Sequence, residues 1–449
     1  MSGQKTFTIT LPLITEPWHE DFINKRIDMC HRLYNQCVKK TKNAYVEMIK
    51  TKEYRAIKEE LQEIYKEKKL KEAEEKSVEE KKGKDGNKKK EKDKKDKKTP
   101  REEELYKQLN NLKMKYKITQ FGMMELSSKL AKKAGYNVDL SYDETSRVGK
   151  RLWSAWHKFL YENGNDVHFS KYYNYNSVEG KTNKGGIKLL YTDKGNWDGY
   201  RWAVSWKGVL IPVKIDENNK YEQEVLENDI AYNRILRKTV NGKQKFYVQA
   251  VLKGTPVQKT NEETGEVIHK LGHGTVGLYI TLTKVTATTE NEVREYQLAE
   301  GIQPIKDQVA EIQRKMDNSK RATNPDKYNE NGTLKTSGGT KTKWVYSNHY
   351  KELRKEKASL QAKEARMRKQ SHEILANEII SLGDDFIINK QDFKSYQERK
   401  EEVKEDGTVI RRKRFGSVIA DRAPSEFVNI LERKLKLYYD IDLVKPDDI

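Results

Sequence analysis

Residues Gly274–Thr283 read GTVGLYITLT, a short apolar run that decides how the second half of the chain folds. A run of this length, rich in apolar and β-branched residues, favours a buried β-strand. Apolar positions at steps of three and four then predict a helix over 305–316, and a long basic helix is expected over 348–382. A second strand pattern covers 386–389, and a last amphipathic helix covers 427–435. Strands and helices therefore alternate here.

The first half of the chain changes its hydrophobic period once. Residues 5–14 alternate as a strand does, and helical patterns follow over 17–48, 102–134 and 142–161. From about Val167 the period falls from 3.6 to 2. Short strand-like runs then recur between Gly, Asn and Asp turns: IKLLY, RWAVSW, GVLIPVK, NRILR and KFYVQAVL. Together with the N-terminal strand these runs predict a small barrel that the helical region interrupts.

One segment of the helical region lacks the apolar side chains that a core needs. Residues 76–100 read KSVEEKKGKDGNKKKEKDKKDKKTP, in which a single valine is apolar. Such a segment cannot bury enough surface to offset the entropy of folding. We therefore expect a disordered, Lys-rich insert within a helical hairpin.

The charge of the chain indicates a polyanionic partner. Its 449 residues carry a formal net charge of +20, the pI is about 9.4, and the basic residues are spread along the whole chain. A surface this positive suits phosphate backbones, so nucleic acid is the favoured partner. The alternative is a Lys-rich protein from a host with a Lys-rich proteome.

Several other classes of protein are disfavoured. Cys30 and Cys37 are seven residues apart on the core face of a helical pattern, which is neither a zinc knuckle nor a disulfide framework and fits a reducing cytosol. No apolar run approaches the roughly 18 residues of a membrane span, and the N-terminus lacks the form of a signal peptide. Phosphate-loop, nucleophile-elbow and HExxH motifs do not occur.

Four segments together resemble TnpB, the RNA-guided endonucleases that insertion sequences encode and that are related to type V CRISPR effectors. Besides GTVGLYITLT, they are Tyr296–Gly332, Trp344–Ile380 and Arg411–Phe427, and they occur in the family's order over most of residues 272–437. The resemblance implies a RuvC (RNase H-like) nuclease domain in the second half. In such a domain carboxylates hold two magnesium ions, which activate water and stabilise the leaving oxygen.

The chain departs from this family at the positions of those carboxylates. The first aspartate falls on Tyr279, and the glutamate that ends the second strand falls on Asn389. A phenol with a pKa of about 10 is a poor substitute for the hard anionic oxygen that magnesium prefers. The family's zinc element and third aspartate would follow Ile449. We therefore expect no catalytic residue, metal or cofactor, and a pattern most like TldR, the nuclease-dead TnpB-derived repressors.

The expected architecture is an α+β multidomain chain. Residues 1–16 supply the first strand of a wedge-like β-barrel, residues 17–164 form an inserted helical recognition domain, and residues 165–272 complete the barrel. Residues 273–449 form a C-terminally truncated, inactive RuvC-like α/β domain.

Candidate nucleic-acid contacts are cations, which bind phosphates, and nearby aromatic rings, on which bases stack. Solvated helix faces are the alternative explanation, and Trp153 and Trp156 are expected in the core. The candidates are Arg147, Lys150 and Arg151; Lys171, Tyr172 and Tyr173; Arg314, Lys315, Lys320 and Arg321; and Arg411, Arg412, Lys413 and Arg414. By resemblance, the helical region and barrel read a motif beside the target, with the candidates Lys39, Lys40, Lys42, Asn43, Tyr45 and Gln120.

The expected partners are a guide RNA and double-stranded target DNA, with one protein monomer on one RNA in the bacterial cytosol, at the nucleoid. The favoured function is RNA-guided repression of transcription without cleavage. Two alternatives stay open. One is a residual metal-dependent endonuclease that uses Asp384, Asp385 or Asp392, since the register near the second motif is open by a residue or two. The other is a decayed transposon-derived fragment.

Overall fold

The computed structural model describes residues 5–81, 99–162, 164–194, 197, 199–216, 218–240, 242–261, 263–335, 343–389, 392–393, 395–397, 401–403, 409–411 and 415–445. The chain is an α+β multidomain protein, about half helical, with several small sheets. This confirms the predicted fold class at that level. None of the described helices combines the length and apolar content that crossing a membrane requires.

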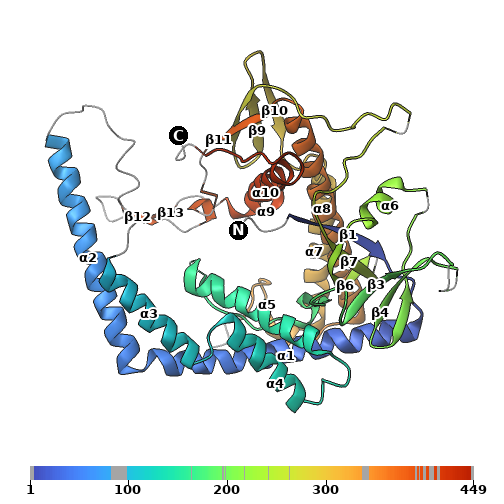
Figure 1. Ribbon diagram of the computed structural model, residues 1–449, viewed down its shortest axis with the longest axis horizontal. Coiled ribbons are helices and arrows are strands. Elements are labelled where there is room, and N and C mark those ends of the chain that lie inside the picture. Colours follow the sequence, from blue (N-terminus) through green and yellow to red (C-terminus); the bar gives the residue numbers. More distant parts are fainter. Residues whose placement is uncertain are drawn as a thin grey trace.

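A helical region follows the first strand. β1 (Thr6–Pro12) leads into α1 (Pro17–Ile49), which lies along one edge of the molecule in Figure 1. The inner face of α1 buries Cys30 and Cys37, as their spacing predicted. The helices that follow are α2 (Lys52–Lys81), α3 (Pro100–Lys115), α4 (Gln120–Lys133) and α5 (Tyr142–Tyr161). α4 and α5 pack against each other and against α1.

Two predictions about these helices were wrong in part. The stretch 102–134 is two helices, because Lys117 takes a left-handed conformation (φ 57°) and Thr119 caps α4. The expected insert 76–100 is too long at both ends: residues 76–81 continue α2, and Thr99 caps α3 through a capping box. Glu and Lys are good helix formers, which explains how α2 extends through residues 76–81 with a single apolar residue, Val78. Residues 82–98 lie outside the described residues.

Strands from both sides of the helical region share one sheet. β1 pairs antiparallel with β7 (Lys243–Lys253), β7 pairs with β6 (Ile230–Val240), and β6 pairs with β2 (Ser177–Glu179). A second sheet contains β3 (Ile187–Tyr191), β4 (Trp202–Trp206) and β5 (Val209–Pro212). The two meet through a bridge between Leu13 and Val213. Closure into a wedge-like barrel, and the domain boundaries that go with it, remain predictions.

The first core lies between these sheets and α1. Phe7, Ile9 and Leu11 alternate along β1 and are buried, as are Ile23 and Ile27 of α1. Burying each side chain of this kind contributes about 1.5–3 kcal/mol. The short helix α6 (Lys220–Leu226) adds Val225 and Leu226 to the same cluster. A strand encoded before the helices thus completes a sheet encoded after them.

A mixed sheet organises the second half. β8 (Thr275–Ile280), β9 (Lys284–Thr288) and β10 (Val293–Gln297) form an antiparallel meander. α7 (Gln303–Thr323) and α8 (Asn348–Ile380) then cross over, as a parallel pairing requires, and β11 (Asp385–Ile388) pairs parallel with β8. The order is β10-β9-β8-β11.

Helices cover one face of this sheet. Val276, Leu278 and Ile280 of β8 are buried in a second core with side chains of α8 and α10 (Pro424–Lys434), among them Ile379 and Phe427. The short helix α9 (Gly416–Arg422) precedes α10, and β12 (Glu401–Val403) pairs with β13 (Val409–Arg411). Predicted strands and helices of this half are therefore present where the periodicity put them.

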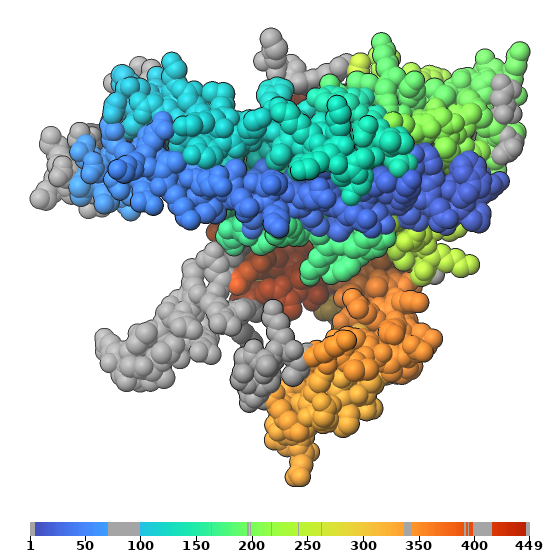
Figure 2. Space-filling model, turned by 90° about the horizontal axis from the view of Figure 1, so that it is seen from below, coloured from blue at the N-terminus to red at the C-terminus, as the bar shows by residue number. Residues whose placement is uncertain are grey.

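α7 and α8 form an arm that leaves the body of the protein. They pack together around Ile312, Met316 and Leu353. Figure 2 shows the outer part of this arm projecting away from the face formed by α1, α3 and α4. The arm and that face are therefore two separate helical surfaces.

Candidate nucleic-acid interface

Tyr279 stands on the uncovered face of β8. It pairs with Thr286 of β9, and its side chain is 56% exposed, while its neighbours Leu278 and Ile280 point into the second core. The alternation of the strand fixes this orientation, because successive side chains point to opposite faces. The position where the family resemblance puts the first catalytic carboxylate therefore presents a phenol to solvent.

Asn389 follows β11 directly and binds β8 on both sides of Tyr279. Its backbone amide donates to the Leu278 carbonyl (3.0 Å), its Oδ1 accepts from the Ile280 amide (2.8 Å), and its Nδ2 donates to the Ile280 carbonyl (3.4 Å). The carboxamide thus acts as one more peptide unit of the parallel ladder. An ionised carboxylate has no hydrogen to donate and could not make both bonds.

The nearby aspartates have other partners. Asp384 Oδ1 accepts from the Gly274 amide (2.9 Å), and Asp385 Oδ2 accepts from the Thr275 hydroxyl (3.2 Å). Hydrogen bonding from His273 is the main cause that lowers the pKa of Asp384. Thr275 is four residues before Tyr279, or about 13 Å along a strand. Asp384 and Asp385 therefore lie at the opposite end of the β8–β11 pair from Tyr279 and Asn389.

Asp392 lies beyond β11. It accepts a hydrogen bond from the Ser395 amide (3.3 Å), and so caps a short turn. Among the side chains that the structure describes, no three His, Cys, Asp or Glu residues gather into a group that could hold a metal ion.

Three of the six candidates for reading a flanking motif share a groove. Lys39, Lys40 and Asn43 of α1 line a space of about 380 Å³ together with Lys133 of α4. Lys42 instead forms an ion pair with Asp166 (2.6 Å). The Tyr45 ring packs 5.2 Å from that of Trp156 and 5.5 Å from that of Phe159, and Gln120 is half-buried in the first turn of α4.

The three candidates on α5 come together in a pocket. Arg147, Lys150 and Arg151 line a space of about 370 Å³ between α5 and the strands β2 and β6. On the inner face of the same helix, Trp156 is buried and its Nε1 donates to the Thr41 hydroxyl (3.0 Å). Trp153 is half-buried against the first core. The tryptophans therefore pack α5 against the first core, while the three cations line the pocket.

An exposed aromatic turn leads into this pocket. Tyr172 and Tyr173 are 51% and 60% exposed, and Lys171 beside them is exposed too. The Arg237 guanidinium lies 5.1 Å from the centre of the Tyr172 ring. Tyr173 has the freer face for a stacking base.

The candidate cations of α7 divide into two groups. Arg314 and Lys315 are exposed, and Lys315 pairs with Glu311 (2.7 Å). Lys320 lies 3.9 Å from the centre of the Trp344 ring, and Arg321 lies 5.4 Å from that of Tyr328. The second group therefore sits on aromatic rings supplied by the segment between α7 and α8.

The last candidate block is described only at its first residue. Arg411 ends β13. Arg412, Lys413 and Arg414 lie outside the described residues, so their contacts remain predictions, as does a role in binding for every candidate above.

Sequence reasoning missed three cationic residues of these sites. Lys133 joins the α1–α4 groove, Arg234 joins the α5 pocket, and Lys327 lies 4.7 Å from the Trp344 ring. Arg234 sits on β6 opposite Glu179 of β2, so the pairing of two distant strands decides its place. No local pattern signals that pairing.

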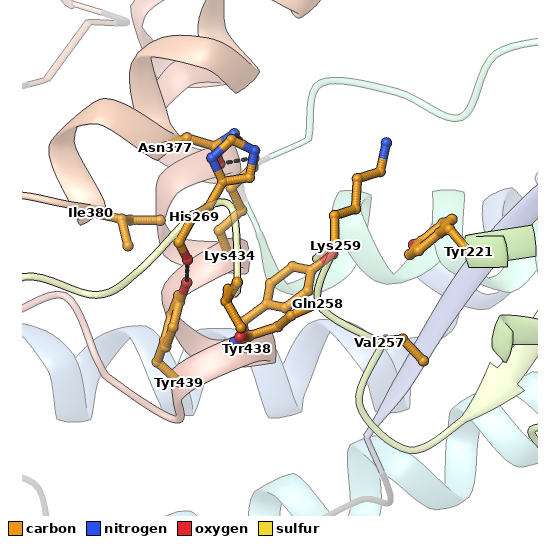
Figure 3. Close-up of a pocket in the computed structure, with 11 residues that line it drawn as sticks. Tyr221, Val257, Gln258, Lys259, His269, Asn377, Ile380, Lys434, Tyr438 and Tyr439 are labelled. Atoms are coloured by element: carbon orange, nitrogen blue, oxygen red, sulfur yellow. Dashed lines mark hydrogen bonds between the residues drawn. The ribbon is translucent and has the colours of Figure 1, made fainter. Parts of the chain in front are cut away.

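A further pocket lies between the first core and the second core (Figure 3). It measures about 230 Å³ and lies between the loop 257–269 and the helices α8 and α10. The Tyr439 hydroxyl donates to the His269 carbonyl (2.9 Å), and the Asn377 amide lies 3.2 Å from His269 Nε2. Burial is the main cause that lowers the pKa of His269. These bonds tie the loop to the second core.

Solved structures similar to this chain include two Cas12f complexes. No protein-family profile matches the sequence, and no curated protein matches it. A Cas12f1–sgRNA–target DNA complex aligns over 99% of this chain and 90% of that chain, with 11% identity and a TM-score of 0.40. A CRISPR–Cas12f ternary complex aligns over 98% and 88%, with 12% identity and a TM-score of 0.21.

Proposed function

We propose that this chain is a nuclease-inactive, RNA-guided DNA-binding protein of the TnpB-like class, of the TldR kind. It carries a guide RNA, occupies matching DNA beside a short flanking motif, and represses transcription there. The proposal includes a wedge-like barrel and an inactive RuvC-like domain in residues 273–449. The observation that supports it most is that the strands carrying the two sequence motifs are neighbours, so that Tyr279 and Asn389, where the family resemblance puts the carboxylates, lie on adjacent strand ends.

The chemistry at these two positions argues against cleavage. A two-metal nuclease needs carboxylate oxygens that converge on both ions. The side chain of Asn389 is hydrogen-bonded to the main chain of Ile280, and Tyr279 has a phenol in place of a carboxylate. Asp384 and Asp385 are bound to the start of β8, at the other end of the strand pair.

The cationic sites support binding. Lys39, Lys40 and Lys133 line one groove and Arg147, Lys150 and Arg151 line a pocket, so both present positive charge in concave surfaces. In RNA-guided systems base pairing reads the sequence, while the protein holds the backbone and reads a short flanking motif. A basic scaffold without catalytic carboxylates is sufficient for that task.

The test is to purify the protein expressed with its own locus and to sequence the RNA bound to it. We expect one structured RNA with a defined variable end. DNA matched to that end should then be bound more tightly than unmatched DNA and stay intact in Mg²⁺ and in Mn²⁺. Heterogeneous RNA would overturn the guided reading. Cleavage that is lost on changing Asp384, Asp385 or Asp392 to Asn would instead support the residual nuclease.

A further inference from the structure

The pocket between α5, β2 and β6 brings together cations from a helix and a strand. Four cations line it: Arg147, Lys150 and Arg151 of α5, and Arg234 of β6. Two carboxyl groups share it, Glu144 and Glu179. Its volume of about 370 Å³ falls within the range that small ligand groups occupy, about 300–1,000 Å³.

The protein fixes two of these guanidinium groups in advance. Arg151 donates to the Ser177 hydroxyl (2.6 Å) and carbonyl (3.4 Å), and its guanidinium lies 4.5 Å from the centre of the Tyr175 ring. Arg147 donates to the Lys181 carbonyl (3.2 Å) and lies 4.9 Å from the centre of the Tyr232 ring. An arginine has five N–H donors, so each keeps others for a ligand.

One of those donors is buried without a partner. Within the described part of the chain, Arg147 Nε is shielded from solvent and makes no hydrogen bond. An unsatisfied buried donor costs about 1–3 kcal/mol. A small turn of the guanidinium toward the pocket would let a ligand acceptor pair with this atom and remove that cost.

The acidic groups do not cancel the positive charge. Glu179 is shared between Arg234 (2.8 Å) and Arg147 (3.5 Å). Burial raises the pKa of Glu144, which favours its neutral form, and burial also raises the pKa of the Cys30 thiol in the pocket lining. With four cations and two carboxyl groups, the pocket retains a net positive charge even when both carboxyl groups are ionised.

We propose that this pocket binds one phosphodiester group of a nucleic-acid strand. The planar forks of Arg147 and Arg151 match the oxygen pairs of a phosphate, and Lys150 adds a mobile charge from the exposed side. Tyr175 in the lining is linked through His31 to the exposed Tyr172, which places an aromatic turn beside the phosphate site. Whether the bound phosphate belongs to a guide strand or a target strand rests on the proposed function. The proposal that the pocket binds a phosphate does not depend on it.

The test measures the salt dependence of binding. The full chain, freed of copurified nucleic acid, is titrated with labelled single-stranded RNA, single-stranded DNA and duplex DNA of one sequence. Each phosphate contact contributes about one unit to the slope of log K against log salt concentration. The variants are Lys150→Gln, which changes an exposed side chain, and the pair Arg151→Gln and Arg151→Lys. Lys270→Gln, in an exposed loop ion pair with Glu266, is the control for lost charge.

We expect Lys150→Gln and Arg151→Gln each to lower the slope, by at most about one unit because the pocket holds a single phosphate, and to weaken binding several-fold. Arg151→Lys should keep the slope and lose affinity, and Lys270→Gln should change neither. The probe whose slope falls identifies the strand that is bound. Unchanged slopes for all three probes in the folded Lys150→Gln variant would overturn the phosphate site, yet leave guided binding intact. A wild-type protein that binds no nucleic acid would overturn the proposed function first.

Discussion

The side chain of Asn389 closes the parallel ladder onto the main chain of Ile280, accepting from its amide at 2.8 Å and donating to its carbonyl at 3.4 Å. The two residues are far apart in sequence and meet because β11 lies beside β8. Asn389, where the family resemblance puts a metal ligand, therefore has a structural role. That role needs a side chain with both a hydrogen-bond donor and a hydrogen-bond acceptor.

Changing Asn389→Asp should destabilise the fold. The carboxylate keeps the acceptor for the Ile280 amide but faces the Ile280 carbonyl without a hydrogen to donate. We expect a loss of about 1–3 kcal/mol in the free energy of unfolding, measured by urea denaturation. Asp385→Asn, at the exposed start of the same strand, is the control and should change stability by less than about 0.5 kcal/mol. Equal effects of the two changes would contradict this account.

Changing Gly149 even to alanine should destabilise the protein. A Cβ at this position of α5 would lie 2.5 Å from the Met123 carbonyl oxygen and 2.6 Å from the Met124 Cα, both on the backbone of α4. Gly149→Ala gains about 1 kcal/mol of helix propensity but forces the helices apart, so we expect a net loss of about 1–3 kcal/mol. Gly416→Ala, in α9 with open space around it, should be neutral or stabilising. Thermal melts of both variants test the difference.

The sequence predicted elements better than their assembly. Periodicity located the strand β8 and the long helices, because a buried face repeats at 2 or 3.6 residues wherever it packs. It missed the break at Lys117, which depends on the left-handed backbone conformation of this one residue. It also ended α2 too early, because Glu and Lys favour a helix even where no apolar face is buried.

The candidate sites depend on contacts that periodicity does not encode. Residue type alone identified Arg147 and Arg151, but Arg234 joins them through the pairing of β2 with β6. The ring of Tyr45, a candidate contact residue, packs against that of Trp156, since one helix face can serve either purpose, and its role in binding stays a prediction. Tyr279 and Asn389 were identified through family resemblance, and only the fold shows what Asn389 binds.

Acid should weaken the second core through His372. This residue of α8 is fully buried, and its ring lies 5.8 Å from that of Phe427. Burial is the main cause that lowers its pKa, and Glu426 and Glu373 oppose that shift while Arg368 reinforces it. The unfolded chain therefore binds the proton more readily. The stabilising contribution is complete above about pH 6.5 and is lost as the pH falls toward the lower folded-state pKa.

The measurement is the free energy of unfolding between pH 5 and 8. His372→Leu should flatten the acid limb of the wild-type curve, whose slope from this one proton is at most about 1.4 kcal/mol per pH unit. His349→Leu, at the exposed start of α8, is the control for the loss of a surface histidine. If the acid limb has the same slope in the wild type and in His372→Leu, other groups cause the loss of stability at low pH.

Tyr173 should contribute a stacking surface for RNA. Its side chain is 60% exposed on the turn beside the α5 pocket, whereas its neighbour Tyr172, 51% exposed, has the Arg237 guanidinium 5.1 Å from the centre of its ring. Stacking of one base on an aromatic ring contributes about 1–3 kcal/mol, so Tyr173→Ala should weaken binding of single-stranded RNA by about 5- to 150-fold. Because the ring and not the hydroxyl stacks, Tyr173→Phe should bind as the wild type does. Tyr142→Ala, equally exposed at the start of α5, controls for the loss of a surface aromatic. Fluorescence anisotropy at fixed salt measures all four proteins, and equal affinities of Tyr173→Ala and wild type would exclude the stacking role.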